Sequence, residues 1–279
     1  MTSPPPEPIC DVHLALAQWY RTPLGRWVGQ VEAHYLAGAL ENTFGYYLLH
    51  YGNIAPFETT LQVSRVRRCI AVAPDWRDLA LPITRATPRT ASCCCALPPL
   101  LPLTASFEQL PFPSDSLDVV VLPHILDFVA DPQQVLCEAE RVLIPDGRLV
   151  LLGFNPLSSW GIWRLGNWRR CQMPWSGQWQ TAGRLCEWLD IVGLQVERCD
   201  KLVYRPPLRS ARGSQLAWLD TWGRRYWRPF GAVYAICAVK RVSALMPLRW
   251  RQRRRRVLVT GATVAHPTTH PYVDIVAPK

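Results

Sequence analysis

The residue with the clearest potential for chemistry is His124, which follows the apolar run of residues 117–122. Such a β-branched run is typical of a parallel strand buried on both faces, and open α/β sheets bind ligands outside the carboxyl ends of their strands. A histidine at that point could accept a proton from a hydroxyl or a nitrogen of a substrate. The alternative is a loop histidine that only packs or caps. Asn155 follows the next apolar run and is a second candidate for substrate contact, although Asn-Pro is also common in turns.

The segment around these two residues predicts a strand–helix–strand unit. Asp131-Pro132 provides an N-cap and a first helical residue. Apolar residues then recur at helical spacing until the Pro-Asp-Gly turn at 145–147, and residues 148–153 form the next predicted strand. A strand, a helix and a second strand in this order predict a right-handed crossover within a parallel sheet.

Further elements are predicted on both sides of this unit. Thr22-Pro23 opens a helix that continues to about Asn42, and Thr181 caps another helix, which Gly193 ends. Residues 82–105 contain five prolines, so we expect an irregular insertion with one short strand. The other predicted strands are residues 46–51, 68–73, 194–198 and 231–241.

Four short motifs lie in order within residues 110–154: Leu110-Pro111-Phe112, Leu117-Asp118-Val119-Val120, Glu140-Arg141-Val142-Leu143 and Pro145-Asp146-Gly147. Their order and spacing resemble class I S-adenosylmethionine-dependent methyltransferases of the ubiquinone-biosynthesis-like branch, known as type 11. Segments PLGR (23–26), LPH (122–124) and GFNP (153–156) resemble a smaller bacterial subgroup. The resemblance implies an α/β fold: a doubly wound, mostly parallel, seven-stranded Rossmann-like sheet with N-terminal helices and a basic helical insertion. It also implies methyl transfer from S-adenosylmethionine to an acceptor that the sequence does not identify.

The cofactor loop departs from the family pattern. Such enzymes place an acidic residue and a GxGxG loop after the first strand, because glycine lets the backbone approach the cofactor closely. Here only Gly52 remains, and Ile54 and Pro56 occupy the other glycine positions. Asp75 is the nearest match to the acidic residue that binds the ribose. By resemblance, the residues expected to contact the cofactor are His50, Gly52, Asn53, Ser106 and Phe107.

Two functions of different classes follow. In the first, the chain is an enzyme that binds S-adenosylmethionine through a modified loop, with His124 as the candidate catalytic residue. In the second, the pocket has decayed and the methyltransferase fold binds an anionic partner without catalysis. Binding of the cofactor separates the two. A plain RNA-binding module is a weaker third interpretation, because the sequence has no compact RNA-binding signature.

The charge distribution predicts an anionic partner. Residues 1–155 hold 10 basic and 15 acidic residues, whereas residues 156–279 hold 21 and 6, with ten of the 13 tryptophans. Aromatic residues alternate with arginine at 160–164, 168–170 and 224–228. Such clusters suit either stacking on nucleic-acid bases or insertion at a lipid head-group layer. The alternative is a solvated face whose tryptophan rings pack in the core.

The expected domain organisation is an N-terminal extension (1–20), a methyltransferase-like domain (21–245) and a basic, flexible tail (246–279). The apolar run 230–239 is too short to span a bilayer, and the N-terminus lacks the pattern of a signal peptide. We therefore expect a cytoplasmic protein whose ten cysteines stay reduced. The run Cys93-Cys94-Cys95 lacks the spacing of metal ligands, so no metal site is predicted.

Overall fold

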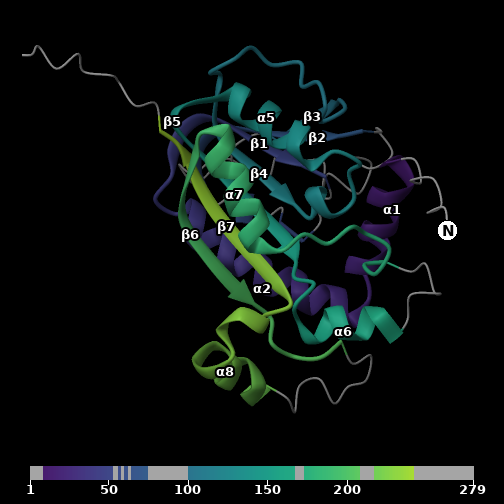
Figure 1. Ribbon diagram of the computed structural model, residues 1–279. Helices are drawn as coiled ribbons and strands as arrows, with labels where there is room; N and C mark the ends of the chain where they lie inside the picture. Colours follow the sequence, from purple (N-terminus) through teal and green to yellow (C-terminus); the bar gives the residue numbers. More distant parts are fainter. Residues whose placement is uncertain are drawn as a thin grey trace, which may run out of the picture. The chain divides into compact units, whose positions relative to one another are not determined.

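The computed structural model describes residues 9–52, 56–57, 60–61, 64–74, 100–166, 173–207 and 217–241. Within these ranges, seven strands form one sheet in the order β3-β2-β1-β4-β5-β7-β6 (Figure 1). The strands are β1 (Phe44–Tyr51), β2 (Arg65–Ala73), β3 (Leu100–Thr104), β4 (Leu117–Pro123), β5 (Leu143–Phe154), β6 (Leu194–Leu202) and β7 (Val233–Lys240). Strands β3, β2, β1, β4 and β5 pair in parallel, and β7 runs antiparallel to both neighbours. The predicted seven-stranded, mostly parallel sheet is confirmed.

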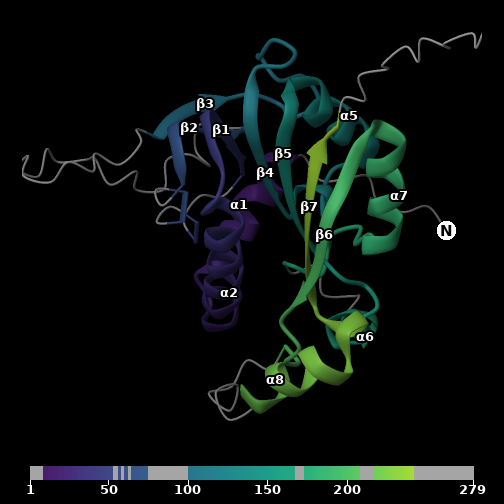
Figure 2. The same ribbon diagram turned by 90° about the vertical axis from the view of Figure 1, so that its left-hand side faces the viewer.

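Helices cover both faces of this sheet. They are α1 (Ile9–Tyr20), α2 (Pro23–Leu40), α5 (Pro132–Val142), α6 (Ser159–Gly166), α7 (Ala182–Val192) and α8 (Ala217–Tyr226), with 3-10 turns η1 (Ile125–Asp127) and η3 (Arg228–Phe230). Leu136 of α5 and Leu185 of α7 belong to the apolar cluster on one face. Trp19 of α1 and Leu36 of α2 belong to the cluster on the other face. Figure 2 shows the two layers edge-on, and they make the fold doubly wound.

Strand β4 shows why the sequence is apolar at successive positions. Val120 and Leu122 face the cluster with α5 and α7, whereas Val119 and Val121 face the cluster with α1 and α2. Successive side chains of a strand point to opposite faces, so a strand with helices on both sides needs apolar residues at every position. The predicted two-sided burial of this strand is confirmed.

The predicted helix ends follow from local hydrogen bonds. The Thr22 side chain accepts a hydrogen bond from the Gly25 amide at the start of α2. Asp131 accepts from the amides of residues 133 and 134 at the start of α5, and Gly193 has a φ of 94° at the end of α7. Each cap satisfies backbone groups that the helix itself leaves without partners. The crossover helix is therefore fixed between β4 and β5, whose carboxyl ends carry the candidate site.

Helix α1 packs against the sheet, since Leu16, Trp19 and Tyr20 all lie in one apolar cluster with α2. Contacts within the chain group residues 1–242 as one unit. The domain boundaries at residues 20 and 245 stay predictions, and the tail lies outside the described residues, as does most of the insertion at 82–105. None of the helices in the described ranges is long and apolar enough to cross a membrane.

Candidate functional site

The candidate site lies at the carboxyl ends of the central strands. Strand β1 ends at Tyr51, β4 at Pro123 and β5 at Phe154, so that Gly52, His124 and Asn155 follow them directly. The Gly52 amide donates a hydrogen bond of 2.8 Å to the carbonyl of Val72, and the His124 amide donates one of 2.7 Å to that of Leu152. These bonds extend the sheet by one residue at each point and fix where the following loops begin.

Gly52 has a φ of 94°, a conformation that side chains disfavour. A Cβ atom at this position would lie 3.4 Å from Nδ1 of His13, which is an ordinary contact distance. Glycine is therefore needed for the backbone turn, and the imidazole of α1 lies beside it. No motif in the sequence indicates that His13 lies at this position.

Two buried histidines at this end of β1 have no hydrogen-bond partner for either ring nitrogen among the described residues: His13 and His50. Burial lowers the pKa of His13 to about 4 and that of His50 to about 3. Both rings are therefore neutral at pH 7, and each keeps one donor and one acceptor. Since buried polar atoms are almost always hydrogen-bonded, these atoms mark a place where a polar ligand would gain partners.

The other predicted cofactor contacts lie in different surroundings. Ser106 is exposed two residues after β3. Phe107 is buried, and its ring meets that of Tyr51 edge-on at 4.9 Å between centroids, so it contributes to the core. The structure brings Gly52 and His13 together, while Asn53 and Asp75 lie outside the described residues.

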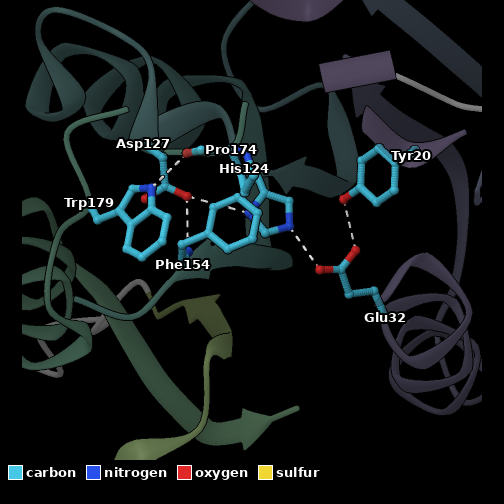
Figure 3. A network of polar contacts seen from close by, with 7 residues as sticks. All are labelled: Tyr20, Glu32, His124, Asp127, Phe154, Pro174 and Trp179. Carbon is cyan, nitrogen blue, oxygen red and sulfur yellow. Dashed lines mark hydrogen bonds and ion pairs between the residues drawn. The ribbon is translucent and has the colours of Figure 1, made fainter. Parts of the chain in front are cut away.

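His124 sits in a buried network of polar groups at the ends of β4 and β5 (Figure 3). Its Nε2 lies 2.9 Å from Oε1 of Glu32, and its Nδ1 lies 3.4 Å from Oδ2 of Asp127. The Tyr20 hydroxyl donates to Oε2 of Glu32 at 2.8 Å, and the Phe154 amide donates to Oδ2 of Asp127 at 2.9 Å. The network therefore connects α1, α2, β4 and β5. It is built from side chains far apart in the sequence.

The two carboxylates determine the charge of His124. Burial alone would lower the pKa of the imidazole, but the charge of Glu32 and the hydrogen bonds with Asp127 and Glu32 outweigh it and raise the pKa to about 9. Burial raises the pKa of Asp127. A protonated imidazole donates from both ring nitrogens, and the carboxylates of Glu32 and Asp127 are the two acceptors. His124 could accept a substrate proton only if a substrate atom replaced one of these partners, so its catalytic role stays a prediction.

Asn155 is fully engaged within the protein. Its side-chain amide donates to the carbonyls of Pro229 and Gly231, both at 2.9 Å. Its carbonyl oxygen accepts a hydrogen bond from the Leu157 amide at 3.1 Å. These contacts join the end of β5 to the segment before β7 and favour the turn interpretation of Asn155. No group of three or more potential metal-binding side chains occurs within the residues that the structure describes.

The strand order and the antiparallel β7 define the fold of class I methyltransferases. A similar solved structure is an S-adenosylmethionine-dependent methyltransferase of Thermotoga maritima, a possible histamine N-methyltransferase, with a TM-score of 0.58 at 19% identity over 80% of this chain and 93% of that one. Another is an S-adenosylmethionine-dependent methyltransferase of Mesorhizobium loti, with a TM-score of 0.53 at 15% identity over 75% and 97%.

At the level of sequence, residues 76–151 match the family described as "Methyltransferase domain". This part of the chain is similar to the type 11 methyltransferase domain, and S-adenosylmethionine is the cofactor that this similarity implies. The uncharacterized protein YafS of Escherichia coli is 32% identical over 161 residues, 56% of this chain and 62% of YafS. The ubiquinone/menaquinone biosynthesis C-methyltransferase of Hahella chejuensis is 46% identical over 59 residues, 20% of this chain and 24% of that protein. The chain thus matches less than two thirds of either relative.

Proposed function

We propose that this protein transfers a methyl group from S-adenosylmethionine to an acceptor that is not yet identified. The observation that carries the proposal is the juxtaposition of Gly52 and His13 at the carboxyl end of β1. Gly52 has a positive φ, and His13 next to it has two buried nitrogens without a partner among the described residues. This is the edge of the sheet at which the fold binds its ligands.

The residues present fit the cofactor in a modified way. A neutral imidazole at His13 can donate a hydrogen bond to the carboxylate of the cofactor. In the family, the backbone amides of the glycine loop would bind this carboxylate. The Gly52 amide itself is engaged with Val72, so His13 supplies a donor that this part of the loop lacks. The Ser106 hydroxyl is exposed after β3 and can bind an adenine nitrogen. When bound, the cofactor supplies an electrophilic methyl group on a sulfonium.

The role of the chain is then to position the reactants. Methyl transfer requires the acceptor atom to lie in line with the methyl–sulfur bond, and correct placement supplies much of the rate. The Tyr20–Glu32 hydrogen bond ties α1 to α2, and Glu32 in turn contacts His124 after β4. We infer that this network holds His13 of α1 over Gly52. A proton-accepting role of His124 is part of the proposal only if an acceptor reaches its ring.

Calorimetry with S-adenosylhomocysteine on the full chain tests the proposal. We expect the wild type to bind. Gly52→Asp should reduce the affinity at least tenfold, about 1.4 kcal/mol, because its carboxylate would oppose that of the ligand. The matched control is Gly38→Asp on α2, where an added Cβ meets no atom within 4 Å. His13→Phe keeps an aromatic ring against Tyr51 but removes both nitrogens, and it should also weaken binding.

The outcomes separate the two functions. Failure of the folded wild type to bind the ligand would reject the enzyme and favour the non-catalytic, anion-binding alternative. Wild-type affinity in Gly52→Asp would show that the pocket lies elsewhere. A cytoplasmic location belongs to the same proposal, and it is supported by the free cysteines of the described part: Cys69, Cys137, Cys186, Cys199 and Cys237.

A further inference from the structure

Helix α8 and turn η3 carry a cluster of exposed aromatic rings. Its members are 46–60% exposed, and we call them the aromatic surface: Trp218, Trp222, Tyr226, Trp227 and Phe230. The first three are four residues apart, which places them on one face of the helix. Trp222 lies at the centre, with ring centroids at 5.3 Å from both Tyr226 and Trp227. Exposed apolar clusters of this kind mark interaction sites.

Helix α6 exposes aliphatic side chains at the same end of the molecule. Ile162 is 74% and Leu165 76% exposed, and Leu157 just before the helix is 63% exposed. Figures 1 and 2 both place α6 and α8 beyond the carboxyl ends of β5 and β6. The aromatic surface and these aliphatic residues therefore belong to the edge of the sheet that carries Gly52 and His124.

Both helices are held firmly by the segment after β6. The Tyr204 amide donates to Oδ1 of Asp220 on α8 at 3.0 Å, and the Trp160 indole of α6 donates to the carbonyl of Arg205 at 2.8 Å. Gly223 lies so close to the Tyr204 ring that an added Cβ would approach it to 2.5 Å. Helix α8 thus packs against the Tyr204 ring through Gly223, and its large aromatic rings point outward.

The segments that contain these helices are basic in sequence. Residues 156–180 and 203–231 together hold nine arginines and one acidic residue, Asp220. The carboxylate of Asp220 is already engaged by Arg205 and by the Tyr204 amide. The net charge of these segments therefore favours an anionic partner.

The side chains favour a lipid bilayer over a nucleic acid. Ile162 and Leu165 are the most exposed apolar residues of α6, and aliphatic chains insert among acyl chains but do not stack on bases. The rings around Trp222 contact one another at interplanar angles of 50–69°, so they do not form a row of parallel faces for bases. Tryptophan, tyrosine and arginine are the residues that lie at the level of lipid head groups.

We propose that the aromatic surface and the aliphatic residues of α6 dock the protein onto an anionic lipid bilayer. The rings lie at the head-group level, the aliphatic side chains reach the acyl boundary, and the arginines contact anionic head groups. The carboxyl edge of the sheet then faces the membrane. This inference is independent of the proposed methyl transfer, because it uses none of the residues assigned to the cofactor.

Cosedimentation of the full chain with vesicles tests the inference. We expect binding to phosphatidylcholine vesicles that contain phosphatidylglycerol, weaker binding to pure phosphatidylcholine, and a decrease with added salt. The triple variant Trp218→Ser/Trp222→Ser/Tyr226→Ser should bind at least tenfold more weakly. The double variant Ile162→Ser/Leu165→Ser should act in the same direction. Because all five residues are exposed, both variants should fold and bind S-adenosylhomocysteine as the wild type does.

The matched control is Phe44→Ser/Tyr46→Ser at the amino end of β1. Those rings are also more than 60% exposed and lie against Arg65 and Arg67, but they occupy the opposite edge of the sheet. The control should bind vesicles as the wild type does. Wild-type binding by the folded triple variant would assign the interaction to other charges, such as the arginines at 253–256, and overturn the proposal. The proposal would also be overturned if the wild type did not bind vesicles. The same holds if a single-stranded RNA displaced the protein from vesicles and its binding required Trp218 and Trp222.

Discussion

Replacing Glu32 with glutamine should remove a pH dependence of folding stability that the buried network creates. Glu32 has no exposed surface, and its charge is the largest cause that raises the pKa of His124 to about 9. Glu32→Gln keeps the size of the side chain but removes that charge. His124 should then lose its proton at pH 7, because burial disfavours the imidazolium.

The magnitude follows from the pKa of His124 in the two states. The ordinary value of 6.5 applies to the unfolded chain, and about 9 applies to the folded one. The folded state binds the proton more tightly, so the contribution to stability is fully present below pH 6.5 and is lost as the pH rises through 9. The difference corresponds to about 3 kcal/mol. Glu32→Gln should therefore cost about 3 kcal/mol near pH 6 and much less near pH 10.

Urea unfolding followed by circular dichroism at several pH values measures this difference. Buried thiols such as Cys69 also lower the stability at high pH, since burial raises the pKa of Cys69 to about 12, but they do so equally in both proteins. The matched control is Glu138→Gln, whose partner Arg141 does not titrate in this range. Equal pH slopes in wild type and Glu32→Gln would refute the assignment of His124 as a buried imidazolium.

Further substitutions and one deletion also have expected outcomes. Gly52→Ala should lower the free energy of unfolding by about 1 kcal/mol because of its φ, whereas Gly38→Ala in the last turn of α2 should raise it by at most about 1 kcal/mol; urea unfolding compares the two. Tyr234→Phe should leave stability unchanged or raise it, since its buried hydroxyl has no hydrogen-bond partner among the described residues. Tyr20→Phe should lower it by about 1–3 kcal/mol, because Glu32 loses a donor. Deletion of residues 249–279 should preserve folding and ligand binding and weaken binding to anionic surfaces, measured by the melting temperature and by cosedimentation.

The central part of the fold was predictable because its signals are local. The apolar run of β4 requires helices on both sides, and Asp131-Pro132 begins α5 where the cap and the proline predict. The helix ends at Val142, three residues before the predicted turn at 145–147. Strand β5 begins at Leu143, so it starts before the turn rather than after it. Strand β2 similarly begins at Arg65, three residues before the predicted start, because exposed arginines at its amino end hide the strand pattern.

The polar network was not predictable, because its members come together only through tertiary packing. Tyr20 and Glu32 are 12 residues apart, and Glu32 and His124 are 92 residues apart. The local signal for the network is Glu32, which shares the buried face of α2 with Val28 and Leu36. His13, which is not part of the network, similarly shares a face of α1 with Leu16 and Tyr20, and both of these are buried. A polar residue at a core position requires a partner, but the sequence does not indicate which one.

The loop after β1 departs from the glycine pattern of the family, and the structure gives a physical reason. Pro56 occupies a position where such enzymes have glycine, and it packs against α2 at Gly29, where an added Cβ would lie 2.9 Å from the Cβ of Pro56. The same added atom would lie 3.2 Å from the Tyr20 ring. Glycine therefore permits a close approach on α2 rather than in the loop. The missing side chain of Gly29 lets both α1 and the loop pack against this helix. Because Tyr20 and His13 both belong to α1, this packing also brings the imidazole to Gly52. In the proposed function, His13 then supplies a hydrogen-bond donor where the family uses its glycine loop.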